Sequence, residues 1–112
     1  MAEDSFAADI YKLTGHRALA RDFGLRDQMR NAAVSIMSNI AEGFERGRSG
    51  EFHQFLSVAK GSCAEVRSLL YVTRDADYID EATFRLLMGR AQEVGRLVGG
   101  LRSSVERRRH SA

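Results

Sequence analysis

The segment Gln28–Gly43 most constrains the fold, because its apolar residues cover more of a helix surface than one neighbour can bury. At about 100° per residue, Met29, Ala32 and Ile36 fall on one side of the predicted helix. The apolar arc continues past a half-circle through Ala33, Met37, Ala41 and Phe44. We therefore predict a central helix of a bundle that is covered on two sides, and its surplus apolar surface suits a subunit boundary.

The composition favours an all-α chain with a single domain, residues 1–112. The sequence has 112 residues, 10 glycines, no proline and no tryptophan, so nothing indicates a β sandwich or a proline-rich linker. No apolar run approaches the roughly 20 residues that span a bilayer. The first residues, Met1–Ser5, are acidic and do not form a basic signal region. We expect a cytoplasmic protein without a membrane segment.

Helix punctuation predicts an up-down-up-down antiparallel four-helix bundle with helices at about 5–20, 25–46, 50–75 and 80–108. Gly15 weakens the middle of the first helix. The cluster 47–50 separates the second helix from the third, with Ser49 as the expected N-cap. Asp80 is the expected N-cap of the last helix, whose Phe84 is spaced for a hydrophobic staple with Ile79.

The central segment also resembles a known family, the four-helix-bundle proteins named after the intervening sequences of 23S ribosomal RNA genes. These are similar to the accessory variability determinants of diversity-generating retroelements. The resemblance covers about residues 10 to 80 and continues after Gly43 through Ser49, Glu51, Phe52, Phe55, Leu56, Ala59, Gly61, Ser62, Glu65, Tyr78 and Ile79. The chain departs from the family pattern at Met37, where a proline is expected, so this helix should run through without a kink.

The resemblance implies a non-enzymatic subunit that forms a homo-oligomeric ring, plausibly a homopentamer. It also implies a basic surface for RNA or DNA, or for a partner such as a reverse transcriptase. A second interpretation is a protein–protein scaffold or regulator, in which the basic face docks an acidic partner and nucleic acid has no role.

Positive charge is concentrated toward the C-terminus, where residues 82–112 hold seven arginines and two acidic residues. Arg85, Arg96 and Arg107 recur every eleven residues and should form a stripe about 33 Å long on one helix. Arginine binds phosphate in a two-pronged manner but equally forms ion pairs between helices. The candidate phosphate contacts are Arg46, Arg48, Arg85, Arg96, Arg107, Arg108 and Arg109. No aromatic residues interleave with these arginines, so the sequence does not support base-specific recognition.

Two further sets of residues invite a structural or functional interpretation. Small residues at heptad spacing on the third helix predict a close subunit contact, although an ordinary solvent face is the alternative. The interface candidates are Ser57, Gly61, Ala64 and Ser68, with Met37 and Ala41. A polar set can either fix helix register or build a functional surface, and it consists of Gln28, Asn39, Glu42 and Glu65.

The sequence gives little support for catalysis, a metal or a cofactor. His16, His53 and His110 lack the neighbouring ligands that a metal site needs, and the glycines before Ser49 lack the lysine of a phosphate loop. The single cysteine, Cys63, falls on an apolar face and is expected to be a packing residue. A residual enzymatic interpretation rests on Glu42 and Glu65, if both point inward. We expect a protein that is not an enzyme.

Overall fold

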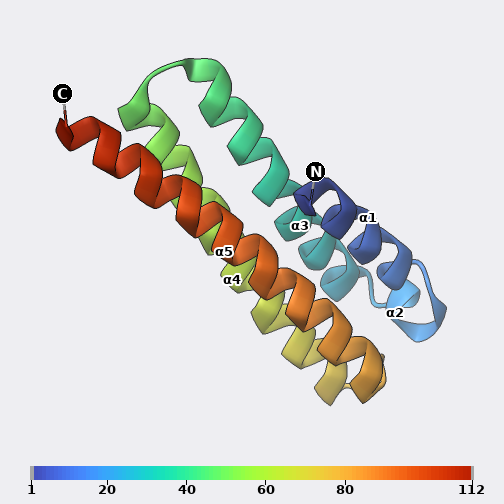
Figure 1. Ribbon diagram of the computed structural model, residues 1–112. Helices are drawn as coiled ribbons and strands as arrows, with labels where there is room; N and C mark the ends of the chain where they lie inside the picture. The colour runs from blue at the N-terminus through green and yellow to red at the C-terminus, as the bar shows by residue number, and fades with distance from the viewer. Residues whose placement is uncertain (1, 112) are drawn as a thin grey trace.

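The structure is a computed structural model that describes residues 2–111, and within them it contains only α-helices. The all-α prediction is confirmed. The elements are α1 (Ala2–Thr14), α2 (Arg17–Arg21), α3 (Phe23–Arg46), α4 (Ser49–Asp75) and α5 (Glu81–Ser111). The four main helices, α1, α3, α4 and α5, run alternately in opposite directions (Figure 1). Helix α4 packs extensively against α3 and α5, and α1 packs mainly against α3.

The predicted first helix, 5–20, is wrong as a single element, because the chain breaks at Gly15 into α1 and the short α2. The backbone N–H of Gly15 closes the last turn of α1 on the carbonyl of Tyr11, and Arg17 takes a positive φ of 53°. In the short α2, Ala18 is exposed and Leu19 is buried. Arg30 of α3 caps the end of α1, since its Nη2 donates to the Tyr11 carbonyl at 3.4 Å and its Nε donates to Thr14 Oγ1 at 2.7 Å.

Helix α3 begins and ends close to its predicted positions. The Asp22 side chain caps it by accepting from the Leu25 backbone N–H at 3.2 Å, and Gly47 ends it with a left-handed φ of 71°. The helix is continuous through Met37, as the sequence predicted. Tyr78 Oη donates to Asp22 Oδ2 at 2.8 Å, and this hydrogen bond raises the pKa of the Tyr78 phenol.

The sequence predicts Ser49 as the N-cap of α4 and Asp80 as the N-cap of α5. Arg48, and not Ser49, occupies the N-cap of α4, and Ser49 is its first helical residue. At α5 the predicted cap is confirmed, because Asp80 Oδ1 accepts from the Thr83 backbone N–H at 2.7 Å. That hydrogen bond lowers the pKa of Asp80, as expected when the charged form is stabilised. Helix α5 extends to Ser111, beyond the predicted end at 108.

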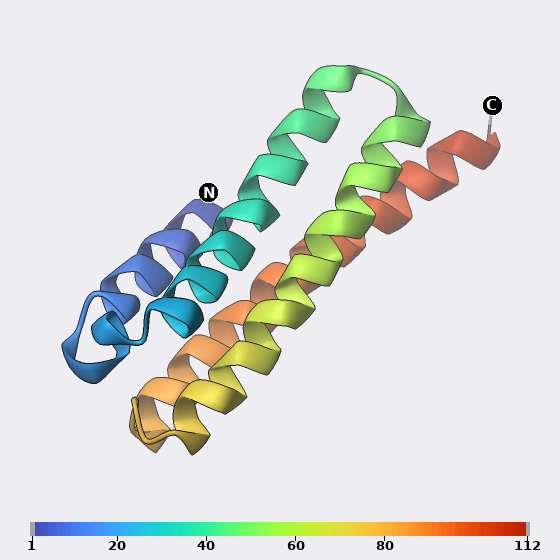
Figure 2. The ribbon, with the colours of Figure 1, turned by 180° about the vertical axis from the view of Figure 1, so that it is seen from behind.

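Helix α1 is too short to cover the whole length of its neighbours. Its 13 residues span about 20 Å, whereas the 24 residues of α3 and the 31 of α5 span about 36 and 46 Å. Both views show α1 beside the first part of α3 only (Figures 1 and 2). The second part of α3 therefore has no partner on the side that α1 covers in the first part. This difference in helix length creates the apolar groove described below.

Most apolar residues on the facing sides of α3 and α5 are buried, and those that stay exposed lie where α1 does not reach. The apolar face of α5 is buried from Phe84 to Val105 except for Leu101, which is 43% exposed. On α3, Ile36 is buried, whereas Ala41 and Phe44 are exposed although they continue the same apolar arc. The wide arc thus divides into a buried core and an uncovered apolar surface.

Candidate nucleic-acid interface

Five of the seven candidate arginines gather at one end of the molecule, which we call the arginine end. The end of α3, the start of α4 and the end of α5 meet there (Figures 1 and 2). Arg48 and Arg108 line one surface cavity, and Arg48 and Arg109 line the next. The arginine end comprises Arg46, Arg48, Arg107, Arg108 and Arg109, all of them exposed. Folding therefore joins two basic segments that are far apart in the chain.

Ion pairs within the protein neutralise part of the positive charge at the arginine end. Arg46 Nη2 lies 3.1 Å from Glu42 Oε1, and its guanidinium stacks 5.4 Å above the Phe55 ring. Arg109 Nη1 lies 3.2 Å from Glu106 Oε2, which His53 Nε2 also approaches to 3.0 Å. These pairs are exposed, so each is worth little and can exchange with another anion. Within the described residues, Arg48 and Arg107 form no ion pair with a carboxylate.

The other two candidates, Arg85 and Arg96, lie away from the arginine end. Both are exposed on α5, as the predicted stripe requires. Arg85 is near the start of the helix, where its Nε lies 3.4 Å from Glu81 Oε1. Arg96 lines a shallow cavity of about 580 Å³ between α4 and α5, together with Lys60 and Arg67. The structure thus gathers five candidates at one end of the bundle and leaves these two farther along α5.

An apolar groove adjoins the arginine end, beside the part of α3 that α1 does not cover. It has a volume of about 550 Å³ and runs between α3 and α5, with Phe52 of α4 also in its wall. A smaller cavity of about 180 Å³ continues it and is also lined by Phe44, Phe52, Val105 and Arg108. Arg48 and Arg108 are the only charged residues in these two linings. The groove is lined by Ile40, Ala41, Phe44, Phe52, Leu101, Ser104, Val105 and Arg108.

The groove corrects the expectation that no aromatic residue accompanies the arginines. Phe44 is 70% exposed and shares its cavity with Arg48 and Arg108. Phe52 supports it in an edge-to-face contact, with ring centroids 6.1 Å apart and planes at 79°. The sequence predicts Phe44 as part of an apolar helix face that packs against another helix. The signal that could have found it is the apolar arc of the second predicted helix, which extends beyond the reach of a much shorter first helix.

The predicted interface residues divide between two surfaces. Gly61, Ala64 and Ser68 are exposed on α4, but Ser57 is half-buried and its Oγ accepts from Arg102 Nε at 2.9 Å. We call these four residues the α4 seam. The other two lie elsewhere: Met37 is half-buried in α3, and Ala41 lines the apolar groove.

The predicted polar set does not form a single network. Only Asn39 joins a cluster: its Nδ2 donates to Ser35 Oγ at 2.9 Å, and that oxygen also accepts from Ser62 Oγ of α4 at 2.9 Å. Gln28, Glu42 and Glu65 are exposed, so Glu42 and Glu65 do not form the inward pair on which an enzymatic interpretation depended. Sequence spacing identified polar positions but could not tell which of them face α4.

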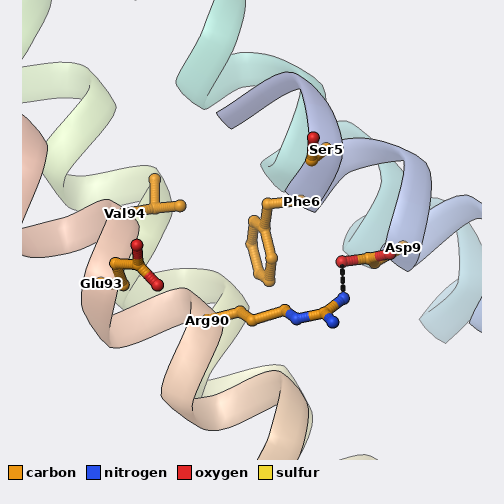
Figure 3. Close-up of a pocket in the computed structure, with 6 residues that line it drawn as sticks. All are labelled: Ser5, Phe6, Asp9, Arg90, Glu93 and Val94. Carbon is orange, nitrogen blue, oxygen red and sulfur yellow. Dashed lines mark hydrogen bonds and ion pairs between the residues drawn. The ribbon is translucent and has the colours of Figure 1, made fainter. Parts of the chain in front are cut away.

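A cavity between α1 and α5 is a structural contact and not a candidate site. It has a volume of about 260 Å³ (Figure 3). The guanidinium of Arg90 forms an ion pair across it with Asp9, and the Phe6 ring projects from α1 into the space between the helices. Since Phe6 is only 2% exposed, this contact anchors α1 to α5.

The described residues offer few groups with unusual reactivity. Among them, no cluster of three or more His, Cys, Asp or Glu side chains is arranged to hold a metal ion. Burial raises the pKa of the Cys63 thiol, which outweighs the opposing effect of the nearby Arg67 charge. A buried thiol with a raised pKa is a packing residue, as the sequence predicted.

No helix in the described part of the chain is long and apolar enough to cross a membrane.

Comparisons with known proteins agree with the helical architecture. A crystal structure of a protein with unknown function from the S23 ribosomal protein family, from Bacteroides thetaiotaomicron VPI-5482, is similar to this chain with a TM-score of 0.80. The two are 20% identical, and the match covers 90% of this chain and 97% of the other. This likeness shows a shared fold. A search of the curated proteins finds no match. The model of the 23S rRNA-intervening sequence protein family matches residues 3–100, so the chain belongs to that family.

Proposed function

We propose that this protein is a non-enzymatic, homo-oligomeric protein that binds nucleic acid through the arginine end. The observation that carries the proposal is that five exposed arginines from three helix ends gather at one end of the bundle, where Arg48 lines one cavity with Arg108 and another with Arg109. The net charge of the whole chain is only +2, so attraction to a polyanion must come from local clustering. Phosphate contacts of this kind are independent of base sequence and weaken as salt concentration rises.

The first prediction concerns a triple charge reversal at the arginine end, Arg48→Glu, Arg107→Glu and Arg109→Glu. Each lost phosphate contact lowers affinity for a single strand about fivefold at 0.1 M salt, so we expect about a 100-fold loss for three contacts. The plot of log affinity against log salt concentration should also become shallower. Fluorescence anisotropy with a labelled single-stranded RNA of mixed sequence, at several KCl concentrations, measures both quantities.

The matched control is Lys12→Glu, Arg17→Glu and Arg21→Glu, three exposed residues of α1 and α2. This variant has the same net charge as the first, but its changes lie at the other end of the bundle (Figure 1). We expect its affinity to stay within about threefold of the unmodified protein. Equal losses in the two variants would contradict a localised site. A third variant, Arg85→Glu with Arg96→Glu, tests the α5 stripe separately.

Self-association is the second part of the proposal, and the exposed small residues of the α4 seam support it. Two exposed apolar residues of α4, Val58 and Val72, lie close to the seam in the helix, at 52% and 49% exposed. The family resemblance favours five subunits of 12.5 kDa each. Since a ring joins unlike surfaces, the seam would pack against a different face of the next copy.

Lysines in the seam should break the oligomer. We expect Ala64→Lys with Ser68→Lys to reduce the mass to that of one subunit, because two charges would be buried without partners. Sedimentation equilibrium measures the mass, and circular dichroism should show unchanged helix content. The control, Asn31→Lys with Ser38→Lys, adds the same charge to exposed positions on α3 and should keep the mass. A seam variant that sediments like the unmodified protein would show that the seam faces solvent.

A further inference from the structure

We propose that the bound nucleic acid is single-stranded and that Phe44 stacks against one of its unpaired bases. Arg48 and Arg108 would hold the neighbouring phosphates. This inference rests on the proposed function and adds to it the class of nucleic acid and a residue that recognises it. It also gives a role to the apolar groove, which charge alone leaves unexplained.

Phe44 is 70% exposed, more than any other large apolar residue whose burial the structure describes, whereas Phe6 and Phe84 are buried. The edge-to-face contact with Phe52 holds the ring at 79° to its support, so the exposed side chain is positioned by a neighbour. Single strands are bound by such aromatic rings beside basic grooves, because every base has a π-face.

Charge complementarity supports the same inference. Both cavities beside Phe44 include Arg108 in their linings, and the smaller one adds Arg48, while no carboxylate lines either of them. An apolar floor whose only charged neighbours are guanidinium groups matches a ligand that alternates apolar bases with phosphates. A duplex fits poorly, since its bases are already stacked and paired.

The size of the groove argues against a docked helix. Its apolar lining runs from Ile40 to Phe44 on α3 and from Leu101 to Val105 on α5, in each case a rise of four residues or about 6 Å. A helix that docks in a groove normally uses anchors at i, i+3, i+4 and i+7, which extend over about 10.5 Å. One flat base needs only a short stretch of apolar wall.

The experiment uses Phe44→Trp as a reporter, because the chain contains no other tryptophan. A single-stranded RNA 12-mer should quench the fluorescence of this tryptophan on binding, and a duplex of equal phosphate content should not. The control is Phe23→Trp, which replaces a 63% exposed phenylalanine with the Arg26 guanidinium 4.8 Å from its ring centroid. Its fluorescence should not respond to the single strand. Equal quenching by duplex, or equal quenching at position 23, would overturn the proposal.

A second variant separates this inference from the proposed function. Phe44→Leu should weaken single-strand binding about tenfold and leave the salt slope unchanged, because a stacking contact is lost and no phosphate contact is lost. If the arginine variants lose binding while Phe44→Leu keeps full affinity, nucleic-acid binding stands and the stacking role is wrong. If Phe44→Leu lowers the oligomer mass, a second copy covers the groove and the proposal is wrong. If no variant and no unmodified protein binds RNA, both proposals fail.

Discussion

Leu56→Ala is expected to lower the free energy of unfolding by about 3–5 kcal/mol. Leu56 of α4 is fully buried, at 0% exposed, within the core that α4 shares with its neighbours. The substitution removes apolar atoms and leaves a cavity that the helices cannot close, since α4 is held against α3 and α5 along its length. Urea unfolding followed by circular dichroism at fixed protein concentration measures the loss, and the m-value should not change.

Leu86→Ala provides the control for this loss. Leu86 of α5 is 55% exposed, so the same chemical change leaves no cavity and should alter stability by no more than about 0.5 kcal/mol. A similar loss in the two variants would contradict the assignment of Leu56 to the core. It would point instead to a surface around Leu86 that becomes buried in the oligomer.

Gly43→Leu is expected to cost about 3 kcal/mol, although leucine favours helix more than glycine does. Gly43 is buried where α3 meets α4, and a Cβ atom there would lie 2.7 Å from Phe55 Cβ and 2.9 Å from Phe52 Cδ1. The Phe55 Cβ atom is fixed to its backbone, so the two helices must separate. The gain of about 0.8 kcal/mol in helix propensity is smaller than this overpacking cost.

The same substitution at Gly89 should have the opposite sign. Gly89 is exposed in α5, and a Cβ atom there would meet nothing within 4 Å. Only the gain in helix propensity from glycine to leucine remains, so Gly89→Leu should raise the unfolding free energy by somewhat less than about 1 kcal/mol. Thermal unfolding of both variants by circular dichroism compares them directly. A stabilised Gly43→Leu protein would mean that α3 and α4 do not approach closely at this point.

The helices could be predicted from the sequence because their ends depend on local contacts. Asp80 caps α5 through a residue three positions away, and Gly47 ends α3 with a backbone conformation that other residues rarely adopt. The prediction failed at Gly15, where a helix end depends on a contact from another element. The sequence predicts one weakened helix through Gly15, but the chain breaks there, and Arg30 of α3 stabilises the new helix end.

The candidate site was only partly predictable. Its arginines were recognised as basic residues, but the pairing of Arg48 with Arg108 around one cavity depends on how α3, α4 and α5 align. The role of Phe44 was missed because its position on an apolar arc is typical of the core. Whether such a residue is covered depends on the length of α1, a distant element.

The sequence by itself determined the all-α class, the family, most helix limits and most of the core, because apolar periodicity and caps act over a few residues. The tertiary structure alone decided which residues become a surface. It joined the arginines of three helix ends, left Phe44 and Leu101 exposed where α1 does not reach, and turned Glu42 and Glu65 outward. These outcomes depend on relative helix length and on packing between segments far apart in the chain, and no local pattern encodes either.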